Sequence, residues 1–268
     1  MLLDMVGNQI QGELPGFANL SKLVYLDMNS NSFHCILTRE VGSLQNLRVL
    51  NLEDNSLGGN ILKEIGNMTK LRQLYLRSNN FFGEIPSSFS YLKELEVLNL
   101  RGNSLSKKIP NFVSNLSNIT SLSLSNKKYT GSIPSSMQKL VRLETLQLEN
   151  NLLSGKIPSW LFNIKGMKHL FLGGNNLISN SDAKIEPTCV LSQLCMKSCG
   201  LAGEITYWIS KLKTLDFLDL SENKLEGIFP QWLAEMKVGS IIMLDNNLTG
   251  SLPPCLFNSK SLPILSLS

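Results

Sequence analysis

The apolar positions of this chain recur with a period of about 24 residues, which is typical of repeat architectures. The stretch from Leu140 to Ile164 shows the unit most clearly, with the sequence LVRLETLQLENNLLSGKIPSWLFNI. Leu146 and Leu148 alternate with polar neighbours, so we predict a short strand that points both leucines to one side. One such unit cannot bury its apolar stripe alone. The pattern therefore predicts a solenoid of stacked coils.

An asparagine follows most of the predicted strands, at the point where the chain must turn. Its side chain can bond backbone groups that the bend leaves unpaired, so we expect a buried ladder of amides. The predicted ladder consists of Asn8, Asn31, Asn55, Asn79, Asn103, Asn151, Asn175, Asn223 and Asn246. Lys127 and Cys199 occupy the same slot in two further units, and consecutive slots are 23 or 24 residues apart. The spacing predicts one array over residues 1–268 with about eleven repeats.

Two units deviate from the pattern. An unpaired ammonium in the interior would be costly, so Lys127 must point outward or the turn must use Asn126 instead. The polar run from Ser179 to Glu186 replaces the usual Gly-x-Ile-Pro segment without changing the repeat length. That run is either a bulging loop with a role in binding or a coil flank without regular structure.

The repeat pattern of the sequence begins and ends within a coil. Leu3 and Met5 already occupy strand positions, and Leu265 and Leu267 open a twelfth strand. We expect an array truncated at both ends, without capping coils. The formal charge of +4 is spread along the chain and does not predict nucleic-acid binding. No apolar run is long enough for a membrane span, so we expect membrane association only through segments missing from this chain.

Five cysteines include a cluster of Cys189, Cys195 and Cys199. Cys195 lies between Leu194 and Met196, which should face inward, so its thiol should face outward, whereas Cys199 takes the inward slot. Thiols on opposite sides of a strand cannot readily share a metal or a disulfide. We expect no metal site and free or buried thiols, with a disulfide through Cys189 as the alternative.

Catalytic chemistry has little support in the sequence. The chain has two histidines, His34 and His169, and Gly155-Lys156 is followed by Ile157, so there is no phosphate-binding loop. No residue can be assigned as nucleophile or base. We expect neither enzymatic activity nor a cofactor.

The segments GEIP at Gly83, GSIP at Gly131 and GKIP at Gly155, with the variants GELP, GEIT and GSLP, resemble the plant-specific extracellular class of leucine-rich repeats. This class includes receptor-like kinases, receptor-like proteins without a kinase, and polygalacturonase inhibitors. The stretch from Gly173 to Ile205 is most similar to the kinase-less receptor-like proteins.

The resemblance implies an α/β-type leucine-rich-repeat solenoid, a right-handed superhelix with a concave parallel β-sheet. It also implies short lateral strands that begin at the Gly-Pro segment, and 3-10 or other short helices on the convex side. Cys35, Lys107 and Ser179 replace the glycine of this segment. We therefore expect the lateral sheet to be interrupted in those three coils.

Five Asn-x-Ser/Thr sequons support export to the cell surface. The predicted N-glycosylation sites are Asn19, Asn67, Asn115, Asn118 and Asn247. Three of them precede a ladder position by twelve residues, as does Asn163, which has no sequon. We expect these asparagines to end a helical turn in a left-handed conformation, and the sequons among them to carry glycans as well.

The outward positions of the predicted strands form the candidate binding face. Tyr75, Arg77 and Arg101 could hold a carboxylate, because arginine binds one with two parallel hydrogen bonds. His169, Phe171 and Phe217 would place aromatic surface on the same sheet, and exposed aromatics are enriched at binding hot spots. The predicted ligand-binding residues are Tyr75, Arg77, Arg101, Gln147, Glu149, His169, Phe171, Lys197 and Phe217.

We interpret the chain as the ligand-recognition segment of a plant cell-surface receptor-like protein in defence or developmental signalling. The resemblance implies a peptide or a microbial or cell-wall protein as ligand, a co-receptor kinase as partner, and the extracellular face of the plasma membrane as location. The alternatives are an inhibitor of polygalacturonase type, secreted to the cell wall, and an intracellular or structural interaction scaffold.

Overall fold

The computed structural model describes residues 1–14, 16–17, 19–125, 128–178, 185–258 and 264–267. The chain divides into two compact units, Met1–Leu143 (unit 1) and Glu144–Ser268 (unit 2). The predictions about Lys127, Asn126 and Ser179 lie outside the described residues. Each unit is a stack of coils with a main parallel sheet, lateral strands and short helical turns. The predicted repeat fold is therefore confirmed.

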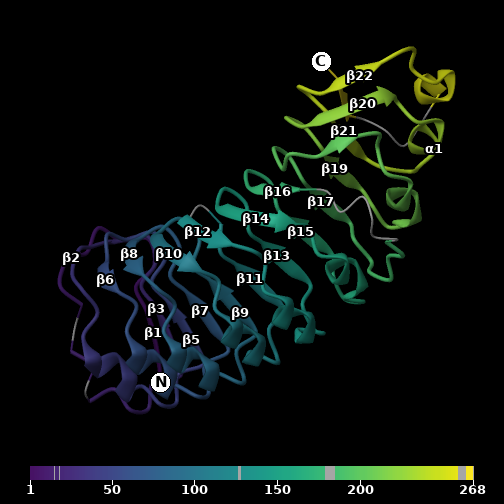
Figure 1. Ribbon diagram of the computed structural model, residues 1–268. Coiled ribbons are helices and arrows are strands. Elements are labelled where there is room, and N and C mark those ends of the chain that lie inside the picture. The colour runs from purple at the N-terminus through teal and green to yellow at the C-terminus, as the bar shows by residue number, and fades with distance from the viewer. Residues whose placement is uncertain (15, 18, 126–127, 179–184, 259–263, 268) are drawn as a thin grey trace. The chain divides into compact units, whose positions relative to one another are not determined.

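The main sheet of unit 1 contains one three-residue strand from each coil, and Figure 1 shows these strands in chain order. They are β1 (Leu2–Asp4), β3 (Tyr25–Asp27), β5 (Val49–Asn51), β7 (Gln73–Tyr75), β9 (Val97–Asn99) and β11 (Ser121–Ser123). The pairs are parallel, and the central leucines stand opposite each other, as Leu50 and Leu74 do. Both of these leucines are fully buried. The apolar alternation thus sets the register of the strands.

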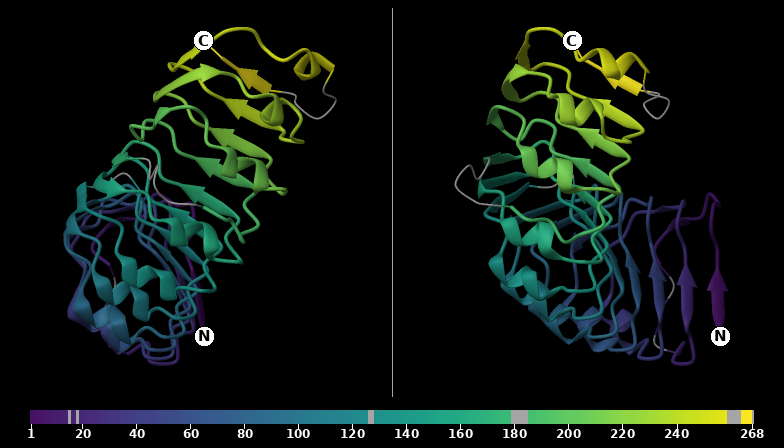
Figure 2. Two further views of the ribbon diagram at one scale, coloured as in Figure 1. Left: turned by 45° about the vertical axis from the view of Figure 1, so that its right-hand side comes forward. Right: turned by 90° about the vertical axis from the view of Figure 1, so that its right-hand side faces the viewer.

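Unit 2 repeats the arrangement, and Figure 2 shows its coils in colours from teal through green to yellow. Its main-sheet strands are β13 (Thr145–Gln147), β15 (His169–Phe171), β17 (Gln193–Cys195), β19 (Phe217–Asp219), β21 (Ser240–Ile242) and β23 (Ile264–Ser266). Leu170, Leu194 and Leu218 occupy the inward central position.

Lateral strands follow most ladder positions and pair in parallel with those of neighbouring coils. In unit 1 they are β2 (Gln11–Gly12), β4 (Ser32–Phe33), β6 (Gly58–Asn60), β8 (Asn80–Gly83), β10 (Ser104–Lys108) and β12 (Lys128–Gly131). In unit 2 they are β14 (Leu152–Lys156), β16 (Asn176–Ile178), β18 (Ala202–Gly203), β20 (Lys224–Ile228) and β22 (Asn247–Thr249).

The expected interruption of the lateral sheet at Lys107 was wrong. Strand β10 runs through this residue and pairs with β8 on one side and β12 on the other. Lys107 adopts the positive φ that glycine supplies in other coils, at +80°. A non-glycine residue in such a conformation costs about 1–3 kcal/mol, which the pairing on both sides offsets. At Cys35 the lateral strand does end early, since β4 stops at Phe33 and only the bridge from Ile36 to Gly58 continues.

Short helical turns connect each lateral strand to the next coil. In unit 1 they are the 3-10 helices η1 (Arg39–Ser43), η2 (Lys63–Asn67), η3 (Ser87–Tyr91), η4 (Asn111–Asn115) and η5 (Ser135–Lys139). In unit 2 they are η6 (Ser159–Asn163), η7 (Tyr207–Lys211), the α-helical α1 (Gln231–Ala234) and η8 (Pro254–Asn258).

The predicted left-handed asparagines at the ends of these turns were wrong. Asn67, Asn115 and Asn163 are the last residues of 3-10 helices, and none of them has a positive φ. The turn after η2 closes with a hydrogen bond from the Met68 N–H to the Ile65 carbonyl, at a φ of −82° for Met68. This closure needs no left-handed residue.

The left-handed position lies instead one residue before each described ladder site. Ser78 has a φ of +51° and Gly102 one of +64°. The equivalent residues in other coils share this conformation, and they are Gly7, Ser30, Asp54, Asn150, Gly174, Ser198, Glu222 and Asp245. This residue reverses the chain so that the following side chain enters the core.

Asn79 shows how the ladder works. Its Nδ2 donates to the Leu52 carbonyl of the preceding coil at 2.8 Å, and its Oδ1 accepts from the Leu57 N–H at 3.0 Å. The same amide also donates to the Leu76 carbonyl of its own coil at 3.3 Å. The bends are therefore bonded both within and between coils. Asn31, Asn55, Asn103, Asn175, Asn223 and Asn246 make equivalent contacts.

Cys199 takes an amide position in this ladder. Its buried Sγ donates to the Leu172 carbonyl at 3.3 Å, in the place of an asparagine Nδ2. Burial raises the pKa of this thiol to about 12, so the group stays protonated and remains a donor. Cys195 lies on the opposite side of its strand, and all five cysteines are free thiols.

Replacing Asn79 by leucine should lower the free energy of unfolding by about 1–3 kcal/mol, because it leaves buried backbone groups unpaired. The matched control is Asn80→Leu, which changes the neighbouring exposed asparagine on the lateral strand. Urea denaturation followed by circular dichroism measures both variants. Equal stability of the two would show that the ladder amide contributes nothing.

Lys107→Gly should raise the free energy of unfolding by about 0.5–1 kcal/mol, because strain is removed while some chain entropy is lost. Lys108→Gly should lower it, since Lys108 is not among the residues of positive φ. Thermal denaturation of the pair distinguishes the two effects. Destabilisation by both substitutions would contradict the assignment of strain to Lys107.

Candidate functional site

The sheet face is the surface formed by main-sheet side chains that point away from the leucine core. In unit 1 it contains Tyr75 from β7, which stands opposite Asn51 on one side and Asn99 on the other. Tyr75 is half-buried, and its hydroxyl donates to Gln73 Oε1 at 3.3 Å. The ring is thus held in place on the sheet.

Arg77 and Arg101 are exposed and follow β7 and β9 at equivalent positions of adjacent coils. Neither guanidinium forms an ion pair within 4.0 Å among the described residues. Adjacent strands in a sheet are about 4.8 Å apart, so both groups can reach one bound carboxylate. The structure therefore brings together the three residues predicted for unit 1.

A buried carboxylate beside these residues was not predicted. Asp27 is only 6% exposed, and each of its two oxygens accepts two hydrogen bonds. Oδ2 accepts from the Tyr25 hydroxyl at 3.0 Å and from Asn51 Nδ2 at 2.9 Å. Oδ1 accepts from the N–H and the Nδ2 of Asn29 at 3.1 and 2.6 Å. The signal in the sequence is an acid or amide at the same outward position of several coils.

Glu53 extends this polar network across two coils. Its Oε1 accepts from Asn99 Nδ2 at 2.7 Å, and the two residues are 46 positions apart. Burial raises the pKa of Glu53, while the charge of Arg77 acts in the opposite direction. Burial and the nearby Glu53 also raise the pKa of Tyr75, which is therefore a neutral hydrogen-bond donor at physiological pH.

The predicted aromatic patch of unit 2 is divided by one strand. His169 and Phe217 occupy the same strand position, but Gln193 of β17 stands between them. Phe171 lies opposite Gln147 and Cys195 one row further along the strands. Gln147, His169, Phe171 and Phe217 were predicted from their register, whereas Gln193 and Cys195 were not among the predicted ligand-binding residues. Each of these side chains is partly exposed on the sheet face.

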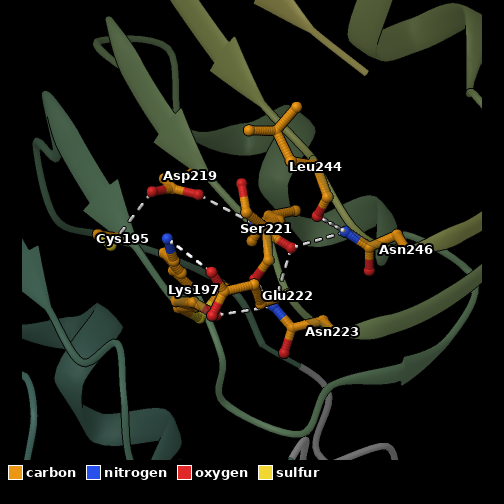
Figure 3. Close-up of polar contacts among 10 residues, drawn as sticks. Cys195, Lys197, Asp219, Ser221, Glu222, Asn223, Leu244 and Asn246 are labelled. Carbon is orange, nitrogen blue, oxygen red and sulfur yellow. Dashed lines mark hydrogen bonds and ion pairs between the residues drawn. The ribbon is translucent and has the colours of Figure 1, made fainter. Parts of the chain in front are cut away.

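His169 and Lys197 both have partners on this face. The Nδ1 of His169 lies 3.0 Å from the Thr145 hydroxyl. Lys197 Nζ forms an ion pair with Glu222 Oε1 at 2.8 Å, and this hydrogen bond raises the pKa of the lysine (Figure 3). A ligand anion would have to compete with Glu222 for Lys197.

Figure 3 also shows the polar contacts around β19. The Ser221 N–H donates to Asp219 Oδ1 at 3.0 Å, and the Cys195 thiol donates to Asp219 Oδ2 at 3.8 Å. Burial raises the pKa of Cys195 to about 11, so its thiol is protonated and unreactive. This part of the face offers hydrogen-bonding groups but no nucleophile.

The asparagine side chains of the five sequons differ in exposure and in hydrogen bonding. Asn67 and Asn115 are exposed at the ends of η2 and η4. Asn118 is partly buried, its Nδ2 donates to the Lys93 carbonyl at 2.9 Å, and its Oδ1 accepts from Arg142 at 2.8 Å. Asn19 and Asn247 are exposed.

Over the described part of the chain, no group of three or more His, Cys, Asp or Glu side chains is arranged to hold a metal ion. The described helices are all too short or too polar to cross a membrane.

The leucine-rich repeat region family model matches residues 28–266. A comparison with curated proteins gives no match. Among solved structures, the Arabidopsis receptor kinase HAESA in complex with the peptide hormone IDA and the co-receptor SERK1 is similar. It has a TM-score of 0.89 and 30% identity, over 99% of this chain and 45% of that chain.

The plant peptide hormone receptor RGFR1 in complex with RGF2 has a TM-score of 0.75 and 32% identity, over 99% of this chain and 39% of that chain. A plant ice-binding protein has a TM-score of 0.77 and 26% identity, over 91% of this chain and 80% of that chain. The chain thus spans less than half the length of these two receptor chains. Together with the repeat geometry, these matches show that it belongs to the leucine-rich repeat family, in the plant extracellular class that includes receptor ectodomains.

Proposed function

We propose that this chain is the ligand-recognition segment of a plant cell-surface receptor and binds a peptide or protein segment on its sheet face. The observation that carries the proposal is the pair of exposed guanidinium groups of Arg77 and Arg101 beside the fixed ring of Tyr75, neither of which forms an ion pair within 4.0 Å among the described residues. Water-exposed arginines on a rigid sheet are suited to bind carboxylates with little loss of conformational entropy.

The polar network adds a second requirement on the ligand. Glu53 lies near Arg77 and contributes a negative charge to the same area. An anion alone would be attracted by the arginines and repelled by Glu53. A segment with a carboxylate over Arg77 and Arg101, and a hydrogen-bond donor or cation toward Glu53, fits both groups.

In unit 2 the partly exposed rings of Phe171 and Phe217 favour apolar contacts with a ligand. Gln147 and Glu149 offer polar contacts beside Phe171, and His169 lies in the same row as Phe217. Lys197 contributes to binding only where a ligand displaces Glu222 or bonds the ion pair as a whole. We propose these residues of unit 2 as a contact surface for the ligand.

The titles of the similar receptors support the class of partner. HAESA binds a peptide hormone and a co-receptor in its solved complex, and RGFR1 binds a peptide hormone. By this likeness we propose a peptide or protein ligand and a co-receptor kinase for the protein that contains this chain. The extracellular face of the plasma membrane is the proposed location, and defence or development the proposed setting.

The triple variant Tyr75→Ala, Arg77→Ser, Arg101→Ser tests the site. A display library of random peptides is selected on the immobilised wild-type chain, and the enriched peptides are measured by calorimetry. They should be rich in carboxylates, and the variant should bind them about tenfold or more weakly, because charge-assisted hydrogen bonds are lost.

The matched control is Arg39→Ser, Arg142→Ser, which removes two exposed arginines away from the sheet face. It should leave affinity unchanged. Equal affinity of the triple variant and the wild type would remove Tyr75, Arg77 and Arg101 from the proposed site.

Glycan occupancy tests the proposed export. After secretion from plant cells, Asn67→Gln and Asn115→Gln should each remove one glycan mass from the intact protein. Mass spectrometry of the wild type and both variants measures the loss. Equal masses of all three proteins, apart from the substitution itself, would contradict the proposed glycan sites.

A further inference from the structure

The helical turns of unit 1 end in a row of exposed side chains, one from each coil. The row consists of Ser43, Asn67, Tyr91, Asn115 and Lys139, the last residues of η1 to η5. Tyr91 is the aromatic member of this row, and it lies between two asparagines of Asn-x-Ser/Thr sequons. An aromatic ring is thus placed between two proposed glycan sites.

The ring of Tyr91 is 64% exposed. It makes no ring–ring contact with any described residue, and its hydroxyl forms no hydrogen bond with one. Tyr207 is equally exposed at 64%, but its ring packs edge-on against Trp232 with centroids 5.7 Å apart. Covering the face of Tyr91 would therefore remove apolar surface from water without breaking an existing bond.

The coils pack tightly on the Asn67 side of Tyr91. Gly66 directly precedes Asn67, and a Cβ atom at this position would lie 2.5 Å from the carbonyl oxygen of Ser88. The hydroxyl of Ser88 also donates to the Lys63 carbonyl at 2.6 Å. No side chain fits between η2 and η3 at this point, so Asn67 is held close to Tyr91.

The Asn115 side of Tyr91 is arranged differently. Ser114 takes the position of Gly66 in this coil, and Lys93 Nζ donates to the Asn115 carbonyl at 3.1 Å. A lysine side chain thus crosses from the coil of Tyr91 to that of Asn115. The lysine next to Asn67, Lys70, extends toward the preceding coil instead, where its Nζ donates to Asn46 Oδ1 at 2.8 Å.

A sugar on Asn67 matches the ring in chemistry and in reach. An N-linked glycan begins with an N-acetylglucosamine on the asparagine Nδ2, and one face of this pyranose presents C–H groups. Such groups carry partial positive charge and are attracted to the negative face of an aromatic ring. Strands of neighbouring coils are about 4.8 Å apart, so this first sugar meets Tyr91 without spanning a second coil.

We propose that the first N-acetylglucosamine of a glycan on Asn67 stacks on the ring of Tyr91, whereas a glycan on Asn115 extends into solvent. This inference rests on the proposed export of the chain and adds the residue that positions the sugar. Tyr91 thereby fixes one glycan against the helical turns of unit 1.

The experiment uses the native chain secreted from plant cells with high-mannose glycans. An endoglycosidase that cleaves between the first two sugars is added, and glycopeptide mass spectrometry follows each site. A stacked first sugar hinders the enzyme, so release should be about fivefold slower at Asn67 than at Asn115. Tyr91→Ser should abolish this difference by accelerating release at Asn67. Tyr91→Phe should keep it, because the ring is retained.

The matched control is Phe82→Ser, which removes another exposed ring of the same coil, on β8, and should change neither rate. Equal rates at Asn67 and Asn115 in the wild type would overturn the proposal. So would an unchanged rate at Asn67 in Tyr91→Ser, or an equal acceleration at both sites, which would indicate a general loosening of the fold.

Thermal denaturation gives a second readout. Asn67→Gln should lower the melting temperature of the glycosylated wild type more than that of the glycosylated Tyr91→Ser variant, and an equal change in both would contradict the stacking. Absence of a glycan on Asn67 in the intact mass would overturn the proposed glycan site itself. A glycan that is present but insensitive to Tyr91→Ser would overturn only the contact with Tyr91.

Discussion

Each coil of this protein must reverse direction after a three-residue strand, and the backbone groups at that bend have to be satisfied inside the protein. In most of the described coils an asparagine side chain does this. Asn79 bonds the carbonyl of Leu52 and the N–H of Leu57 in the preceding coil, as well as its own coil at Leu76. The bond that closes the bend is therefore also the bond that fixes the spacing between coils. The left-handed residue before each described ladder site makes the geometry possible, and its conformational cost recurs in the coils where that residue is not glycine.

A fixed interior leaves the outward positions free to vary, and these form two separate surfaces. On the main sheet, neighbouring side chains are 24 residues apart, as Tyr75 and Asn99 are. On the lateral strands the offset is 22, as between Ser106 and Lys128. The two surfaces thus combine different residues of the same coils. The sheet face of unit 1 contains arginines and carboxylates, while the lateral strands β10 and β12 of that unit carry exposed lysines and hydroxyls.

Much of the fold could be predicted from the sequence because the features that determine it recur in every repeat. The leucine alternation, the asparagine spacing and the opposite orientations of Cys195 and Cys199 depend only on strand geometry. The conformation of Lys107 did not follow, because pairing with both neighbouring strands overrides the local preference of a single residue. The closure of η2 was mistaken for a left-handed cap, although the Met68 N–H closes it with an ordinary 3-10 bond.

The sequence predicts which strand positions form the candidate site, but it does not predict the contacts that their side chains make. Tyr75, Arg77 and Arg101 could be assigned to one surface from register alone. The bond from Asn99 to Glu53 passes over a whole coil, so no pattern within one repeat encodes it. The same limit applies to Lys197, whose pairing with Glu222 depends on side-chain geometry.

These contacts decide which groups of the sheet face can meet a ligand. Asp27 already accepts four hydrogen bonds, and a ligand cation that approached it would have to displace buried donors. Glu53 accepts one bond from Asn99 and keeps further acceptor capacity, so it is the acid that a ligand reaches at lower cost. Lys197 carries a partner, whereas Arg77 and Arg101 carry none among the described residues. In the proposed site of unit 1, two arginines and one glutamate therefore supply the charged groups that remain open to a ligand, and Asp27 holds Tyr25, Asn29 and Asn51 in place beside them.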